Sequence, residues 1–152
     1  MAEADQATQH PEFPQSWSEL DRDEVVAELD KPGRNTNTWL GVARWLEVSG
    51  FADQSYYYYA MAISLPQSHA GTFGRFFERA FGDGAYLQAQ FVAREAVKRF
   101  PREGRAWLWV ARAAAVFTDR TMFNSALDKA ASLKVDPDEI ELVRKHTGHF
   151  FK

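Results

Sequence analysis

Histidine is the residue type in this 152-residue chain that most readily suggests metal or acid–base chemistry, and the four histidines are scattered: His10, His69, His146 and His149. Only His146 and His149 lie close together, three positions apart, and no third ligand with a plausible geometry accompanies them. The sequence also contains no glycine-rich phosphate loop, nucleophile elbow or pair of carboxylates in an apolar setting. We therefore expect no catalytic residue, no metal and no cofactor, and a protein that is not an enzyme.

Arginine and aromatic side chains offer a different chemistry, which is binding. The chain carries a net charge of −3, but residues 1–30 have a net charge of −8 and residues 31–152 a net charge of +5. The basic residues around Pro101 form a local patch rather than a stripe, so we expect no nucleic-acid partner. Guanidinium groups beside apolar side chains suit a protein or peptide partner instead.

The composition also indicates where in the cell the protein is located. There is no cysteine, which excludes disulfides and cysteine-zinc sites. The acidic start, MAEADQATQHPEFPQ, does not resemble a signal peptide, and no apolar run approaches the roughly 20 residues that span a bilayer. The sequence predicts a cytoplasmic location without membrane insertion.

The elements that position the arginines recur with a period of 34 residues. Apolar and small residues repeat at this spacing in three sets: Trp39, Phe73 and Trp107; Val42, Phe76 and Val110; Ala62, Ala96 and Ala130. On the first helix of the first unit, Trp39, Val42, Ala43 and Leu46 follow the i, i+3, i+4, i+7 spacing of a buried helical stripe. Gly50, Gly84 and the pair Thr118-Asp119 mark the turns. We predict three helix–turn–helix units, at about 37–68, 71–102 and 105–135.

The two ends of the chain do not follow the 34-residue repeat. Residues 1–15 are acidic and aperiodic and predict a disordered lead. Residues 16–36 predict an N-terminal helix and linker, beginning with a capping box at Ser18 and Asp21. At the other end, Asp136 followed by Pro137 predicts the start of a helix, so residues 136–152 are expected to form a C-terminal capping helix and a tail. Phe150 and Phe151 either fold back on the last helix pair or stay available for contacts.

The apolar patterns Trp-x2-Val-Ala-x2-Leu, Phe-x2-Phe-Phe-x2-Ala and Trp-x2-Val-Ala-x2-Ala begin at residues 39, 73 and 107. They resemble the tetratricopeptide repeat, over residues 37 to about 135. The resemblance implies an all-α fold: a right-handed superhelix of three such helix hairpins with capping helices at both ends. Phe77 and Phe123 depart from the family, which prefers small residues there, and we expect them to push helices apart locally.

The resemblance also implies a concave surface formed mainly by the first helix of each pair. Nine residues on these helices lie off the buried stripe and are the candidate partner-binding residues: Leu40, Arg44, Glu47, Arg75, Glu78, Phe81, Arg105, Trp109 and Arg112. In this interpretation the arginines orient a peptide and the apolar residues anchor it. In the alternative, Arg75 with Glu78, and Arg44 with Glu47, are i, i+3 ion pairs that only solvate a face.

A second candidate surface is the run of tyrosines at 56–59. Neighbouring residues on a helix point about 100° apart, so the four rings cannot share one face. Tyr56 and Tyr59 fit the buried stripe, which leaves Tyr57 and Tyr58 to face either the N-terminal helix or a partner. The acidic segment itself has two interpretations: a cap on the first repeat, which we favour, or an internal ligand of the groove anchored by Trp17.

The expected function is a scaffold or adaptor that binds a peptide or helix of a partner protein in the concave groove. One alternative is a small chaperone that covers an export substrate or an aggregation-prone partner. Another is a structural subunit that self-associates through Tyr57, Tyr58 or the Phe150-Phe151 tail, which would make the protein a homo-oligomer.

Overall fold

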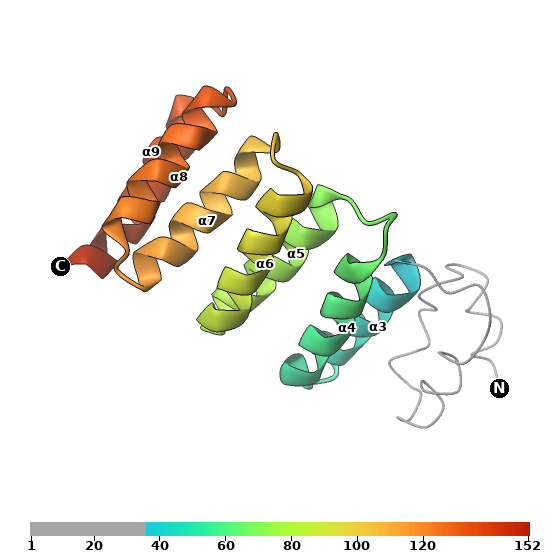
Figure 1. Cartoon of the computed structure of the whole chain (residues 1–152). Helices are drawn as coiled ribbons and strands as arrows, with labels where there is room; N and C mark the ends of the chain where they lie inside the picture. Colours follow the sequence, from blue (N-terminus) through green and yellow to red (C-terminus); the bar gives the residue numbers. More distant parts are fainter. Residues whose placement is uncertain (1–35) are drawn as a thin grey trace, which may run out of the picture. The chain divides into compact units, whose positions relative to one another are not determined.

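The computed structural model of the protein describes residues 36–152 (Figure 1). These residues form seven α-helices: α3 (Thr36–Val48), α4 (Ala52–Ser64), α5 (Ala70–Gly82), α6 (Tyr86–Arg99), α7 (Gly104–Val116), α8 (Arg120–Ser132) and α9 (Pro137–Thr147). A short 3-10 helix, η3 (Gly148–Phe151), follows them. The all-α prediction is confirmed for the described part of the chain. The predicted lead at 1–15 and most of the predicted helix and linker at 16–36 lie outside it.

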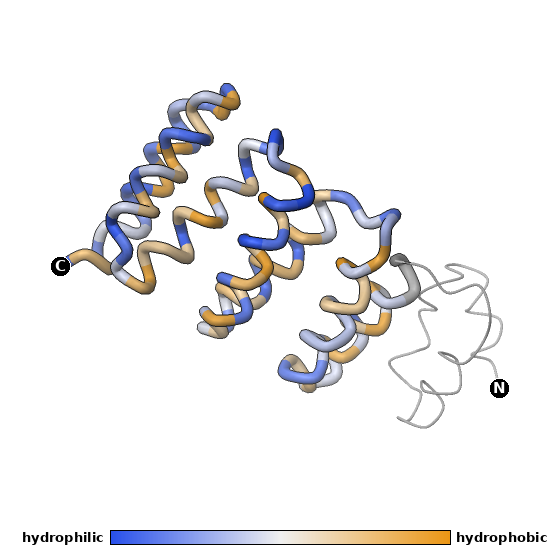
Figure 2. Tube along the Cα trace, in the orientation of Figure 1, coloured by the Kyte–Doolittle hydropathy of each residue, from blue (hydrophilic) through white to orange (hydrophobic). Residues whose placement is uncertain are grey.

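The helix starts repeat at a fixed spacing. The helices α3, α5 and α7 each begin 34 residues after the previous one, and so do α4, α6 and α8. Hydrophobic and hydrophilic residues alternate at short intervals along the helices (Figure 2), as expected where one face of a helix is buried. The described helices therefore form three pairs of equal spacing, followed by α9.

The chain divides into two compact units, one ending at Thr72 and the other beginning at Phe73. In the first, α3 packs against α4 around Val42, Trp45 and Leu46, with Trp39 and Tyr58 against this cluster. Trp45 was absent from the predicted stripe and is only 5% exposed. Its three-residue spacing from Val42 could have revealed it.

In the second unit, α7 is the central element: it packs against α6, α8, α9 and η3. Most of the predicted stripes are buried, including Phe76, Phe77 and Ala80 on α5. Four positions of this unit that the periodicity predicts to be buried differ: Val97, Trp107 and Val143 are half-buried, and Ala131 is exposed. The indole Nε1 of Trp107 donates to the carbonyl of Pro101 at 3.2 Å, which holds the ring at the edge of α7.

The turn between the helices of each pair contains one residue with positive φ. It is Gly50 in the first pair and Gly84 in the second, with φ of 87° and 77°. At the same place in the third pair stands Thr118, with φ of 55°. This conformation is easy for glycine and strained for a β-branched residue. The third turn therefore keeps the geometry of the other two without their glycine.

The C-terminal part of the second unit packs on the helices before it. Asp136 caps α9 by accepting a hydrogen bond from the amide of Asp138 at 2.8 Å, and Pro137 occupies the first turn. The Phe151 ring lies edge-on to Phe123 of α8, with ring centroids 5.0 Å apart. Of the two outcomes expected for the terminal phenylalanines, the structure shows folding back.

None of the helices within residues 36–152 has both the length and the hydrophobicity that a membrane span requires. The same residues contain no cluster of three or more histidine and acidic side chains arranged for a metal ion.

Candidate functional site

Four of the nine candidate residues come together where α5 faces α7: Glu78, Phe81, Trp109 and Arg112. The guanidinium of Arg112 donates from Nη1 to Oε2 of Glu78 at 2.7 Å and from Nη2 to Oε1 at 3.1 Å. This two-pronged geometry matches a planar guanidinium to a planar carboxylate and fixes the orientation of both. Glu78 therefore pairs with a residue 34 positions away, one helix pair further along the chain.

Aromatic rings hold Arg112 from a second direction. Its guanidinium carbon lies 5.0 Å from the ring centroid of Phe77 and 4.6 Å from that of Phe81. Phe77 and Phe81 are themselves stacked, with centroids 5.4 Å apart. A guanidinium over an aromatic face is attracted by the negative charge density of the ring. Arg112 is thus held by both a carboxylate and two rings before any ligand arrives.

Trp109 lies on the same cluster because Gly74 leaves room for it. The indole stacks on Phe77 with centroids 6.0 Å apart. A Cβ atom added to Gly74 would stand 2.7 Å from Cζ2 of Trp109, which is closer than any ordinary contact. Phe77, which departs from the small residue of the family, is fully buried at the centre of this cluster. Gly74, three residues before Phe77 on the same helix, leaves the space in which the indole of Trp109 stacks on Phe77.

A pocket of about 490 Å³ opens beside the cluster, and we call it the Arg112 pocket. It is lined by residues of α5, α6, α7, α9 and η3: Phe81, Tyr86, Arg112, Leu142, Val143, His146, Thr147, His149 and Phe150. Phe81 and Tyr86 meet edge to face at 5.3 Å, and Tyr86 meets Phe150 at 6.4 Å. The pocket therefore combines aromatic and aliphatic walls with one guanidinium.

Two other candidate arginines of the second unit lie apart from this pocket. Nε of Arg105 is 3.4 Å from Oε1 of Glu139 on α9, and the arginine side chain is 67% exposed. Arg75 is exposed and has no ion-pair partner among the described residues. The expected i, i+3 pair of Arg75 with Glu78 is replaced by the pair of Glu78 with Arg112.

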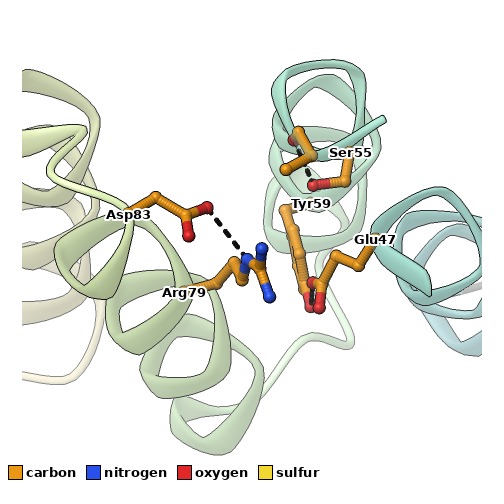
Figure 3. Close-up of polar contacts among 6 residues, drawn as sticks. Glu47, Ser55, Tyr59, Arg79 and Asp83 are labelled. Atoms are coloured by element: carbon orange, nitrogen blue, oxygen red, sulfur yellow. Dashed lines mark hydrogen bonds and ion pairs between the residues drawn. The ribbon is translucent and has the colours of Figure 1, made fainter. Parts of the chain in front are cut away.

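The three candidates of the first unit lie on α3. Leu40 is half-buried, Arg44 is exposed, and Glu47 accepts a hydrogen bond from the hydroxyl of Tyr59 (Figure 3). Tyr59 is buried, and so is Ser55, which donates to the carbonyl of Ala52 at 2.6 Å. Glu47 thus fastens α3 to α4, which is a structural role.

Figure 3 also shows an ion pair at the end of α5, between two residues that lie on either side of Phe81 in the sequence. Nε of Arg79 lies 2.9 Å from Oδ2 of Asp83, four positions later. Pairs at this spacing on an exposed helical face contribute little to stability. Asp83 comes directly before Gly84 of the turn, so the pair lies at the C-terminal end of α5.

The two tyrosines of the second candidate surface have different environments. Tyr57 is 63% exposed. Tyr58 is half-buried, because its ring stacks on Trp39 with centroids 6.0 Å apart and meets Tyr57 edge-on at 5.1 Å. Of the two, only Tyr57 presents most of its ring to solvent.

Sequence reasoning missed Tyr86, Phe150 and Leu142 as parts of the pocket. Phe150 had been noticed, but only as one of two terminal aromatic residues. Tyr86 begins α6 immediately after the turn that follows Phe81, and that proximity was the available signal. The contribution of α9 depends on how this helix packs on α7, which no local pattern specifies.

A scan against protein-family models finds no match for this chain, and a search of curated proteins finds no similar sequence.

Proposed function

We propose that the three helix pairs are tetratricopeptide-like repeats stacked in a right-handed superhelix, with helices at both ends as caps. Two observations support this arrangement. The helix starts repeat every 34 residues, and the positive φ values at Gly50, Gly84 and Thr118 repeat at the same interval. Equal units with equal turns are what a stack of repeats requires, because each unit must present the same face to the next.

We further propose that the protein is an adaptor in the cytoplasm that binds a segment of a partner protein at the Arg112 pocket. The observation that carries this proposal is the preorganisation of Arg112 at the edge of an aromatic pocket. Glu78 accepts one hydrogen bond from each terminal nitrogen of the Arg112 guanidinium. Three of the five N–H donors of the guanidinium therefore remain for a ligand. Because its side chain is already ordered, Arg112 loses little conformational freedom on binding.

The expected ligand follows from the two parts of the pocket. An apolar side chain would fill the space between Phe81, Tyr86 and Phe150, and a carboxylate or backbone carbonyl next to it would accept from Arg112. Such a ligand is a peptide segment with an apolar anchor beside an acidic group. We assign the residues of the pocket to binding rather than to catalysis.

A chaperone for an export or aggregation-prone partner is the second candidate function. The observation that favours it is an exposed apolar residue at the pocket, since Leu142, which lines it, is 51% exposed. Surfaces of this kind mark interaction sites on otherwise polar proteins. In this version the partner's segment would be mainly apolar, and binding would depend little on Arg112.

The experiment compares capture of partners from native cell extract by the wild type, by Arg112→Gln/Phe150→Ala, and by Arg102→Gln/Val48→Ala. The control removes one positive charge and shortens one apolar side chain at two exposed positions that do not line the pocket. We expect a protein retained by the wild type and the control but lost with the pocket variant. Calorimetry with the captured partner should give at least tenfold weaker binding for the pocket variant.

Leu142→Glu provides a second pocket variant that leaves the Arg112 cluster intact. It places a negative charge on the exposed rim and should weaken an acidic ligand without unfolding the helix. Equal capture by all four folded proteins would place binding elsewhere and refute the adaptor proposal as stated. Loss with Leu142→Glu alone, with Arg112 dispensable, would favour the chaperone.

A further inference from the structure

A second concave feature of the Phe73–Lys152 unit lies on other elements than the Arg112 pocket. It is a groove of about 350 Å³ formed by α6, α7 and the start of α8, and we call it the α7 groove. Figure 1 shows α7 between α6 and α8. Buried residues of α7 form its floor, among them Val110, Ala113 and Ala114. No residue of the α7 groove belongs to the Arg112 pocket.

The edges of the α7 groove are apolar and exposed. Phe117 at the end of α7 is 41% exposed, and Met122 on α8 is 40% exposed. On α6, the exposed residues Leu87 and Phe91 precede Arg94 of the groove by seven and three positions, so they lie on the same helical face. The apolar surface therefore extends along α6 beyond the groove itself, in a pattern typical of an interaction site.

The charges at the groove are unbalanced toward positive. Arg94 and Lys98 of α6 line it one turn apart, and Arg94 has no ion-pair partner among the described residues. Lys98 is 3.2 Å from Glu95, but its side chain is 73% exposed, so this pair is weak. Asp119, on the opposite side, accepts a hydrogen bond from the amide of Met122 as the N-cap of α8.

We propose that the α7 groove docks an acidic amphipathic helix of a partner protein. Its apolar face would enter the groove, and two of its carboxylates, one turn apart, would pair with Arg94 and Lys98. The surface from Leu87 to Lys98 extends for about 16 Å along α6, which is about three turns of a helix. An apolar stripe at i, i+3 or i+4 and i+7 is the pattern by which helices occupy grooves of this kind.

Exposure of the groove edges favours a helix over a small molecule. Sites for small ligands enclose most of the ligand's surface. Here Phe117 and Met122 stand open on the rim, and Phe91 and Leu87 lie further out, so a small ligand would leave them uncovered. A helix three turns long covers them together and places its acidic residues at the Arg94–Lys98 end.

The test uses two synthetic, fluorescently labelled helical peptides and the full chain. Both peptides have leucines on one face; one carries two glutamates four positions apart near one end, and the other carries lysines there. We expect the wild type to bind the glutamate peptide at least tenfold more tightly than the lysine peptide, by fluorescence anisotropy. Arg94→Glu/Lys98→Glu should reverse this preference, and Phe91→Ser should weaken both peptides about threefold or more.

The matched control is Arg102→Glu/Lys145→Glu, which changes the net charge by the same amount at exposed positions outside the groove. It should keep the preference of the wild type. Arg94→Gln/Lys98→Gln, which introduces no repulsion, should abolish the preference for the glutamate peptide. This variant replaces the charge-reversed one if Arg94→Glu/Lys98→Glu does not fold. Circular dichroism checks the helical content of each variant.

Three results would overturn the proposal. The first is equal affinity of both peptides for the wild type, or no saturable binding. The second is a concentration-dependent dimer that Arg94→Glu/Lys98→Glu abolishes, which would assign the groove to a second copy of the chain. The third is tighter binding of a peptide with the sequence of residues 16–30 than of the glutamate peptide, which would assign the groove to the chain's own acidic segment.

Discussion

Gly74 and Trp109 show how a single residue shapes the candidate site. The missing Cβ of Gly74 lets the indole of Trp109 approach α5 and stack on Phe77. The guanidinium of Arg112 in turn lies over the ring of Phe77. The orientation of Arg112 therefore depends on Gly74 through Trp109 and Phe77.

We predict that Gly74→Ala lowers the free energy of unfolding by about 1 kcal/mol, because overpacking against Trp109 outweighs the gain in helix propensity. In a Trp109→Ala background the same substitution should raise stability by about 0.5–1 kcal/mol, since only the propensity gain remains. Urea unfolding of the four proteins measures both changes.

Gly82→Ala is the matched control at the residue scale. Gly82 ends the same helix, and a Cβ there would meet nothing within 4 Å. The Gly82→Ala substitution should leave the free energy of unfolding unchanged or raise it. A stabilising Gly74→Ala in the presence of Trp109 would contradict the proposed steric role.

At the scale of elements, the turns between paired helices share one backbone geometry and differ in how easily their sequence adopts it. Gly84 reaches its positive φ without strain, whereas Thr118 reaches a similar value with a branched side chain. A non-glycine residue in the left-handed region costs roughly 1–2 kcal/mol. Thr118 is therefore a position where the chain can be stabilised without replacing a residue that lines the Arg112 pocket or the α7 groove.

We predict that Thr118→Gly raises the free energy of unfolding by about 0.5 kcal/mol, because the relief of strain exceeds the entropy gained by the unfolded chain. Gly84→Ala should lower it by about 1 kcal/mol for the converse reason. Ser125→Gly, at an exposed position inside α8, should lower it by about 0.5 kcal/mol and separates a turn effect from a general effect of glycine. A loss with Thr118→Gly as large as with Ser125→Gly would refute the strain argument.

At the scale of the whole molecule, the aromatic residues that suggested self-association have partners within the chain. Phe151 packs on Phe123, Phe150 meets Tyr86, and Tyr58 stacks on Trp39. Tyr57 is the member of the predicted association surfaces that stays mostly exposed. One exposed ring is a small contact compared with the roughly 800 Å² per partner of a stable interface.

We therefore predict a monomer of 17.3 kDa at micromolar concentrations. Sedimentation equilibrium between about 5 and 100 µM should give a mass independent of concentration. A dimer that disappears with Tyr57→Ser would instead support the second sequence-based alternative, a self-associating subunit.

The sequence alone determined the helices and their spacing, because both depend on neighbours within about one turn. The stripe around Phe76, the turn at Gly84 and the N-cap at Asp136 could each be read locally, and the helices begin and end close to the predicted residues. The types of the candidate binding residues were equally visible: arginines beside aromatic side chains on the first helix of a pair.

Only the tertiary structure decided which of those residues meet. Glu78 pairs with Arg112, 34 positions away, rather than with Arg75 three positions before it. Phe77 became the centre of a cluster because Gly74 allowed Trp109 to approach, and Tyr86 and Phe150 meet across most of the second unit's sequence. Periodicity specifies the face on which a side chain lies, whereas a site forms where faces of different helices pack, and that packing depends on the shapes of all the side chains between them.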